Sequence, residues 1–204
     1  QDKNLSIVEL NLQAHSKQAG ASKQLELKSN VKMALDTQIV QLPQLAIHIK
    51  LNDPKLAQAE IVLPIHGQLS ANLKDKSLNS TLDAKFDETK LHTTVQVQDF
   101  SNPAISFKVD IDKLNLDRYI KNSAEPTKVD NSKEEDLNLA ALKSLKLDGL
   151  IRIGALQVKN LKINQVQLPL KADQGKITMN GIAAQLYQGS LAGNIGFDVD
   201  GNQF

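Results

Sequence analysis

The amino-acid sequence predicts a mainly β fold: a curved antiparallel sheet that forms an open groove or half-barrel, with one or two short helices. Three observations lead to this prediction. Apolar and polar residues alternate with period two through most of the chain, which puts the apolar side chains of a strand on one face. The breaks between these runs have turn compositions. Helical spacing of apolar residues occurs in only two short places.

The alternation is clearest before residue 112. It starts with Leu25 and Leu27 and continues through residues 31–35, 45–51, 94–98 and 105–111. Residues 19–22, 52–54, 74–76 and 101–103 are rich in Gly, Asn, Asp, Ser, Lys or Pro and predict hairpin turns. This pattern is typical of an antiparallel sheet with one apolar and one polar face.

Two helical segments flank a polar stretch. Leu116–Ile120 predicts a short helical turn, and Asp136–Leu145 predicts a helix with Asp136 as its N-cap. Between them, residues 121–135 are almost free of apolar side chains and predict a flexible polar linker. The sequence therefore predicts a β-sheet segment at 1–120 and a helix plus β segment at 136–204 that packs with it.

The stretch Leu147–Gly196 consists of short alternating runs interrupted by glycine and asparagine. Its glycines have the spacing of turn and bulge residues between short strands. None precedes a predicted helix, so a phosphate site at a helix N-terminus is not expected. Tyr187, in the tetrad Leu186–Gly189, is expected to be partly buried with its hydroxyl at the surface.

Composition and motifs exclude several classes of function. The chain has 24 Lys and Arg against 23 Asp and Glu, few aromatics and no Trp, so we expect no nucleic-acid partner. The absence of cysteine excludes thiol catalysis and cysteine-based metal sites and is compatible with the periplasm. No nucleophile-elbow, P-loop, dinucleotide or zinc-protease motif occurs. We therefore predict no enzyme activity, no cofactor and no metal, with His15, His48, His66 and His92 as solvated surface residues.

No run approaches the roughly 20 apolar residues that span a membrane. Residues 1–4 lack the features of a signal peptide. The chain opens directly into the strand-like Leu5–Leu12 and stops just after Val199. The expectation is a piece of a longer protein, with any signal or membrane anchor outside this sequence.

From about Ile105 to Asp200, the chain resembles the C-terminal region of the AsmA family. The resemblance depends on an ordered set of segments and not on any single one. One departure is Asn180-Gly181, where such proteins often have a proline-containing turn. The matching segments are residues 109–119, 137–145, 147–154, 158–161, 166–168, 172–177 and 186–193.

This resemblance implies a periplasmic segment of an inner-membrane-anchored envelope protein. It also implies a role in outer-membrane homeostasis, in which phospholipid passes along an apolar β groove. The family has no catalytic residues to transfer. The residues expected to line the groove and contact lipid are Ile47, Ile49, Val95, Val97, Ile105, Phe107 and Val109.

Two alternatives stay open at this point. The apolar face of the predicted sheet is also compatible with an ordinary core that packs against a second sheet or a helix. The protein is alternatively a structural or protein-binding β module of the envelope that carries no lipid. The leucine-rich helix at 137–145 either caps the sheet or lies in the groove and moves aside for lipid.

Overall fold

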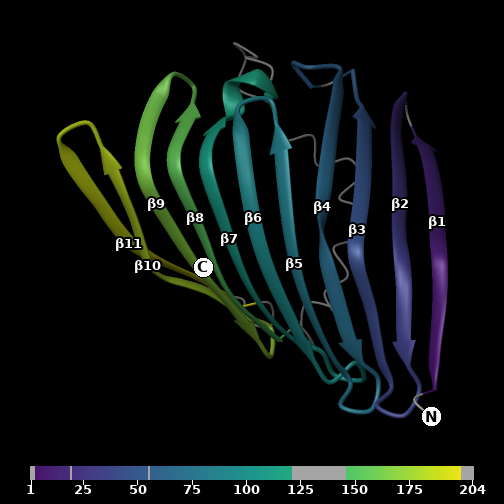
Figure 1. Ribbon diagram of the computed structural model, residues 1–204. Helices are drawn as coiled ribbons and strands as arrows, with labels where there is room; N and C mark the ends of the chain where they lie inside the picture. The colour runs from purple at the N-terminus through teal and green to yellow at the C-terminus, as the bar shows by residue number, and fades with distance from the viewer. Residues whose placement is uncertain (1–2, 19, 55, 121–145, 199–204) are drawn as a thin grey trace.

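The computed structural model describes residues 3–18, 20–54, 56–120 and 146–198 of the 204. These residues form one open sheet in which the strands lie in sequence order (Figure 1). The strands are β1 (Asn4–Gln18), β2 (Ala21–Ala34), β3 (Ile39–Asn52), β4 (Glu60–Asn72), β5 (Ser77–Phe86), β6 (Thr89–Gln98), β7 (Ala104–Asn115), β8 (Lys146–Val158), β9 (Leu161–Asp173), β10 (Lys176–Leu186) and β11 (Gly189–Asp198).

The mainly β, curved and open sheet is confirmed. The predicted turns at residues 19–22, 52–54, 74–76 and 101–103 lie between consecutive strands or at their ends. The first helical turn is present as the 3₁₀ helix η1 (Leu116–Arg118). The predicted linker at 121–135 and the helix at 136–145 lie outside the described residues.

The sheet is not antiparallel throughout. Each neighbouring pair is antiparallel except β7 and β8, which run parallel from Ala104↔Lys146 to Asn115↔Gln157. The alternation within a strand does not encode the direction of its neighbour, and a parallel pair needs a long connection. The 30 residues between β7 and β8 provide it. This parallel pair joins strands β1–β7 to strands β8–β11 in one sheet.

Bulges keep the apolar residues of a strand on one face. The strands are therefore longer than the segments of strict alternation in the sequence. In β1 the register shifts between Ile7 and Leu10, so odd-numbered apolar residues before the shift and even-numbered ones after it share a face. β3 shifts in the same way between Leu42 and Leu45. An extra residue reverses the side-chain alternation at that point, and the following apolar residues return to the same face.

Asn180-Gly181 is a bulge within β10 and not a turn. The register against β11 shifts between Asn180 and Ile182, and Gly181 has a φ of +83°. The side-chain oxygen of Asn194 accepts a hydrogen bond from the Gly181 N–H at 2.7 Å. The left-handed backbone explains why glycine occupies this position.

Gly149 and Gly154 correct the expectation of turn glycines between short strands. Both lie inside the 13-residue strand β8. A Cβ atom at Gly154 would lie 2.5 Å from the carbonyl oxygen of Asp112 in β7, and one at Gly149 would enter the ring of Phe107. These glycines permit close approach of β7, and the strand continues through them.

Candidate functional site

One face of the sheet is apolar from strand to strand because the register aligns the apolar residues. A single row of paired residues crosses nine strands, from β1 to β9, and every member is aliphatic. Its members are Leu12, Leu27, Ile47, Ile65, Ala84, Leu91, Ile111, Ile153 and Val166. Cross-strand contacts of this kind are the main source of sheet stability. We call this surface the apolar face.

The structure places all seven predicted lipid-contact residues on the apolar face, in two groups. Ile47 and Ile49 lie on β3, opposite Ile65 and Leu63 of β4. The other five lie on β6 and β7, where Val95 pairs with Phe107, Val97 with Ile105, and Val109 with Thr93. Strands β4 and β5 separate the two groups. All seven residues are half-buried.

The best-packed part of the apolar face lies on strands that the seven predicted residues do not include. Ile153 of β8, Val166 of β9 and Ala184 of β10 are 6–8% exposed and form one cluster. Its flanking residues are Ile111, Leu114, Ile151, Leu156, Ile163 and Leu168. The alternation in Leu147–Gly196 was a signal for these positions, but the sequence alone did not show that β8 joins β7.

A single layer of strands leaves the apolar face only partly covered. Among the described residues, no side chain is less than 2% exposed, and no second sheet packs on either face. Large apolar residues near the sheet edges are much more open, such as Leu12 at 52% and Leu191 at 61%. The described part of the chain therefore contains no second sheet against which the apolar face could pack as a sandwich.

Phe107 and Gly149 form a matched pair at the β7–β8 junction. They are directly paired in the parallel register. A Cβ atom at Gly149 would lie 2.2 Å from two carbon atoms of the Phe107 ring and 2.7 Å from a third. The ring therefore occupies the space beside Gly149 that a side chain there would fill.

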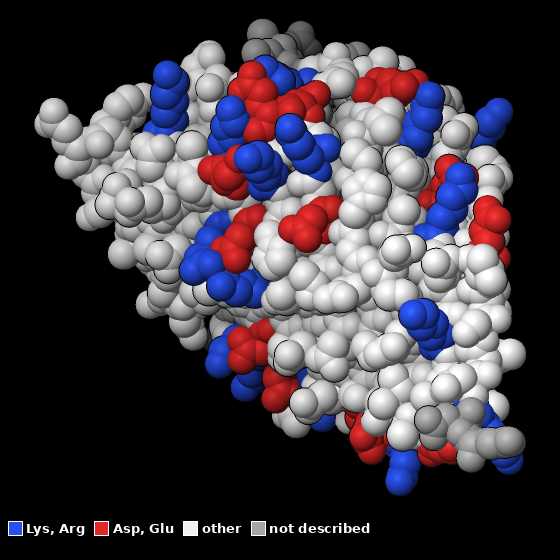
Figure 2. Space-filling model, in the orientation of Figure 1, with Lys and Arg blue, Asp and Glu red and all other residues white. Residues whose placement is uncertain are grey.

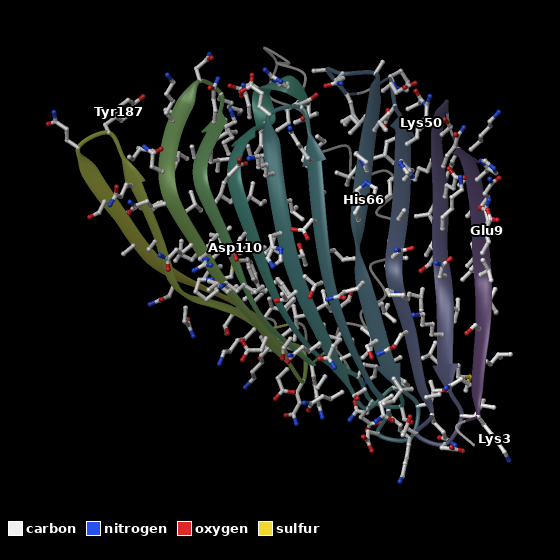
Figure 3. All side chains as sticks on the ribbon, viewed as in Figure 1. Lys3, Glu9, Lys50, His66, Asp110 and Tyr187 are labelled. Carbon is white, nitrogen blue, oxygen red and sulfur yellow. The ribbon has the colours of Figure 1, made fainter. Side chains whose placement is uncertain are left out.

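The opposite face, the polar face, carries a row at the neighbouring register position in which five consecutive side chains are titratable. The row runs from β3 to β9 through Ala46, His66, Asp83, His92, Asp110, Arg152 and Gln167. Figure 2 shows acidic and basic side chains gathered over the middle strands of this face. Figure 3 labels His66 and Asp110, which mark the row.

Neighbours in this row form a hydrogen bond and an ion pair across strands. The Nδ1 of His92 lies 2.7 Å from the Asp83 carboxylate, and Arg152 Nε donates to Asp110 at 2.5 Å. The Arg152 guanidinium lowers the pKa of Asp110 below its ordinary value. The side chains of these pairs are 31–65% exposed, so each pair stabilises the sheet only slightly.

Asp117 of η1 ties the end of β7 to the β8–β9 hairpin. Its carboxylate accepts hydrogen bonds from the backbone N–H groups of Asn160, at 3.0 Å, and Lys159, and from the amide of Gln157 at 3.1 Å. These donors, the Asn160 N–H first, lower the pKa of Asp117. The clamp fixes the parallel strands at one end.

Tyr119, next to η1, donates a hydrogen bond from its hydroxyl to the Asp87 carboxylate. Partial burial, together with this carboxylate, raises the pKa of Tyr119 to about 12.

Tyr187 differs from the sequence expectation, because it is 76% exposed and has a φ of +53° at the β10–β11 turn. The Tyr187 ring therefore does not pack against the buried residues of the sheet.

The four histidines lie on strands, and all four are on the polar face. The rings of His48 and His66 meet edge to face, with centroids 6.2 Å apart. Within residues 3–18, 20–54, 56–120 and 146–198, no group of three or more His, Cys, Asp or Glu side chains is arranged to hold a metal ion. No helix in that part of the chain is long and apolar enough to cross a bilayer.

Comparisons with protein-family models, with curated proteins and with solved structures find no match to this chain.

Proposed function

We propose that this chain is a periplasmic, lipid-conducting segment of an AsmA-like envelope protein, and that phospholipid acyl chains lie along its apolar face. The observation that carries the proposal is the row of aliphatic residues that crosses β1 to β9 under only partial cover. Acyl chains need a continuous apolar surface, and aliphatic side chains offer no hydrogen bond that would hold one lipid in place.

The polar face supports the same proposal. It presents polar and charged side chains to water, among them the Arg152–Asp110 ion pair, while the apolar face binds lipid, so the single layer has one face for each environment. Phe107 contributes because its ring packs against Gly149 and extends the apolar surface from β7 onto β8.

The proposal is tested by lipid transfer to the purified chain. Vesicles of phosphatidylethanolamine and phosphatidylglycerol that contain a fluorescent phospholipid are mixed with the chain, and lipid that co-elutes with protein is measured. We expect the unmodified chain to extract lipid, and Ile49→Asp to reduce extraction at least fivefold. The matched control is His48→Asp, one position away on the polar face of β3, which should extract lipid normally.

Phe107→Asp, with Lys108→Asp as its control, repeats the comparison on β7. Circular dichroism and urea unfolding identify which variants remain folded, and only folded variants are compared. If the unmodified chain extracts no lipid, or if variants on the two faces behave alike, the lipid proposal is wrong. The second candidate, a protein-binding module without lipid, is favoured by the fully exposed strand β11.

A further inference from the structure

A cavity of about 210 Å³ lies at the end of the sheet where η1 follows β7. Its walls come from η1, from the turn between β5 and β6, and from β7, β8 and β9. Figure 2 shows acidic and basic side chains gathered at this end of the sheet. Three cations line the cavity, Lys113, Arg118 and Lys162, against two carboxylates, Asp87 and Glu88. We call it the η1 cavity.

Both carboxylates of the η1 cavity already have partners in its wall. Glu88 lies 3.1 Å from the Lys113 Nζ and 3.5 Å from Arg118. The hydrogen bond from Lys113 is the main cause of the lowered pKa of Glu88. Asp87 accepts a hydrogen bond from the Tyr119 hydroxyl and lies 4.0 Å from Arg118. Lys113 and Arg118 therefore balance the two carboxylates, and the third cation is in excess.

That third cation is Lys162, which lies on β9, across the cavity from the β5–β6 turn. Asn164 follows two residues later, so the two side chains share one face of the strand. Within the part of the chain that the structure describes, neither side chain has an ion pair or a hydrogen bond. Lys162 brings a positive charge and three N–H donors, and Asn164 adds an amide that can donate beside it. This combination suits an anion with several acceptor oxygens.

The η1 cavity also reaches the packed part of the apolar face. Leu114 and Leu156 line it, and both pack against the cluster of Ile153, Val166 and Ala184. A ligand in this cavity therefore meets charged donors and aliphatic carbon together. A phospholipid has both of the matching parts, because its phosphate is joined to acyl chains.

We propose that the η1 cavity binds a phosphate group, with Lys162 and Asn164 as donors, and that the phosphate belongs to a phospholipid headgroup. Hydrogen bonds from a charged donor to phosphate oxygens are roughly twice as strong as neutral ones. Free phosphate shares this chemistry, but only the headgroup also uses the contact with Leu114 and Leu156. The choice of the headgroup rests on the proposed function, whereas phosphate binding does not.

The test compares three ligands by isothermal titration calorimetry with the unmodified chain. Dihexanoyl phosphatidylglycerol has a phosphate and acyl chains, dihexanoylglycerol has the chains alone, and sodium phosphate has the anion alone. The phospholipid should bind about tenfold more tightly than either of the others, as one added charge-assisted hydrogen bond or apolar contact predicts. Lys162→Gln should remove the preference over dihexanoylglycerol. Lys159→Gln is the matched control on the same β8–β9 hairpin, outside the cavity lining, and should keep it.

The proposal is wrong if none of the ligands binds, if dihexanoylglycerol binds as tightly as the phospholipid, or if Lys162→Gln keeps the preference. Sodium phosphate that binds as tightly as the phospholipid would identify the free anion as the ligand and overturn the headgroup assignment. Vesicle extraction separates this proposal from the proposed function. Normal extraction without a phosphate preference refutes the η1 cavity alone, whereas a phosphate preference without extraction supports the cavity and refutes the lipid-conducting segment.

Discussion

The two faces of the sheet are held together by different forces, and β9 shows the contrast in adjacent residues. Val166, on the apolar face, is 6% exposed and packs with Ile153 and Ala184, whereas Gln167, on the polar face, is exposed. Packing of half-buried aliphatic residues is worth more than exposed ion pairs. The same residues therefore provide both the stability of the sheet and the proposed lipid surface, while the polar face tolerates change.

The largest expected effect comes from a charge in the packed cluster. Val166→Asp should destabilise the protein by at least about 3 kcal/mol, because it leaves an unpaired carboxylate among aliphatic side chains. Gln167→Asp should change stability by only about 0.5 kcal/mol. Urea unfolding followed by circular dichroism measures both variants. Equal losses in the two variants would show that the faces contribute alike and would refute the contrast.

A smaller effect is expected at the aromatic pair. Gly149→Val should cost about 1–3 kcal/mol, because the new side chain overlaps the Phe107 ring. The same substitution at Gly196, where the nearest atom to a new Cβ is 3.9 Å away, should cost little. Adding Phe107→Ala to Gly149→Val should recover part of the loss, as measured by urea midpoints. If the double variant is no more stable than Gly149→Val, the overlap is not the cause.

These elements also show what the sequence alone reveals. Alternation at Ile105–Ile111 and at Val95 and Val97 was enough to assign both strands and their apolar side. The pairing of Phe107 with Gly149 was not predictable, because it depends on a parallel register between segments some 40 residues apart. Gly149 and Gly154 looked like turn residues, because a glycine that permits close approach of a neighbouring strand and a glycine in a turn have the same local sequence signal.

The polar face and the strand ends should show the smallest effect, and it should depend on pH. The folded state lowers the pKa of Asp110, through Arg152, and of Asp117, through the Asn160 N–H. A carboxylate with a lowered pKa stabilises the fold fully above its ordinary value of 3.8. That contribution is lost as pH falls through the folded-state value. The urea midpoint should therefore be constant from pH 7 to about pH 5 and fall between pH 4 and pH 2.

Salt and substitution separate the two carboxylates. Asp110→Asn and Asp117→Asn should each reduce the difference in urea midpoint between pH 7 and pH 3, because each removes one group that titrates on folding. High salt should weaken the contribution of Asp110, which comes from an exposed ion pair. It should affect Asp117 less, because its partners are mainly backbone N–H groups. If 1 M NaCl reduces both contributions equally, Asp117 acts as a surface charge and not as a clamp between η1 and the β8–β9 hairpin.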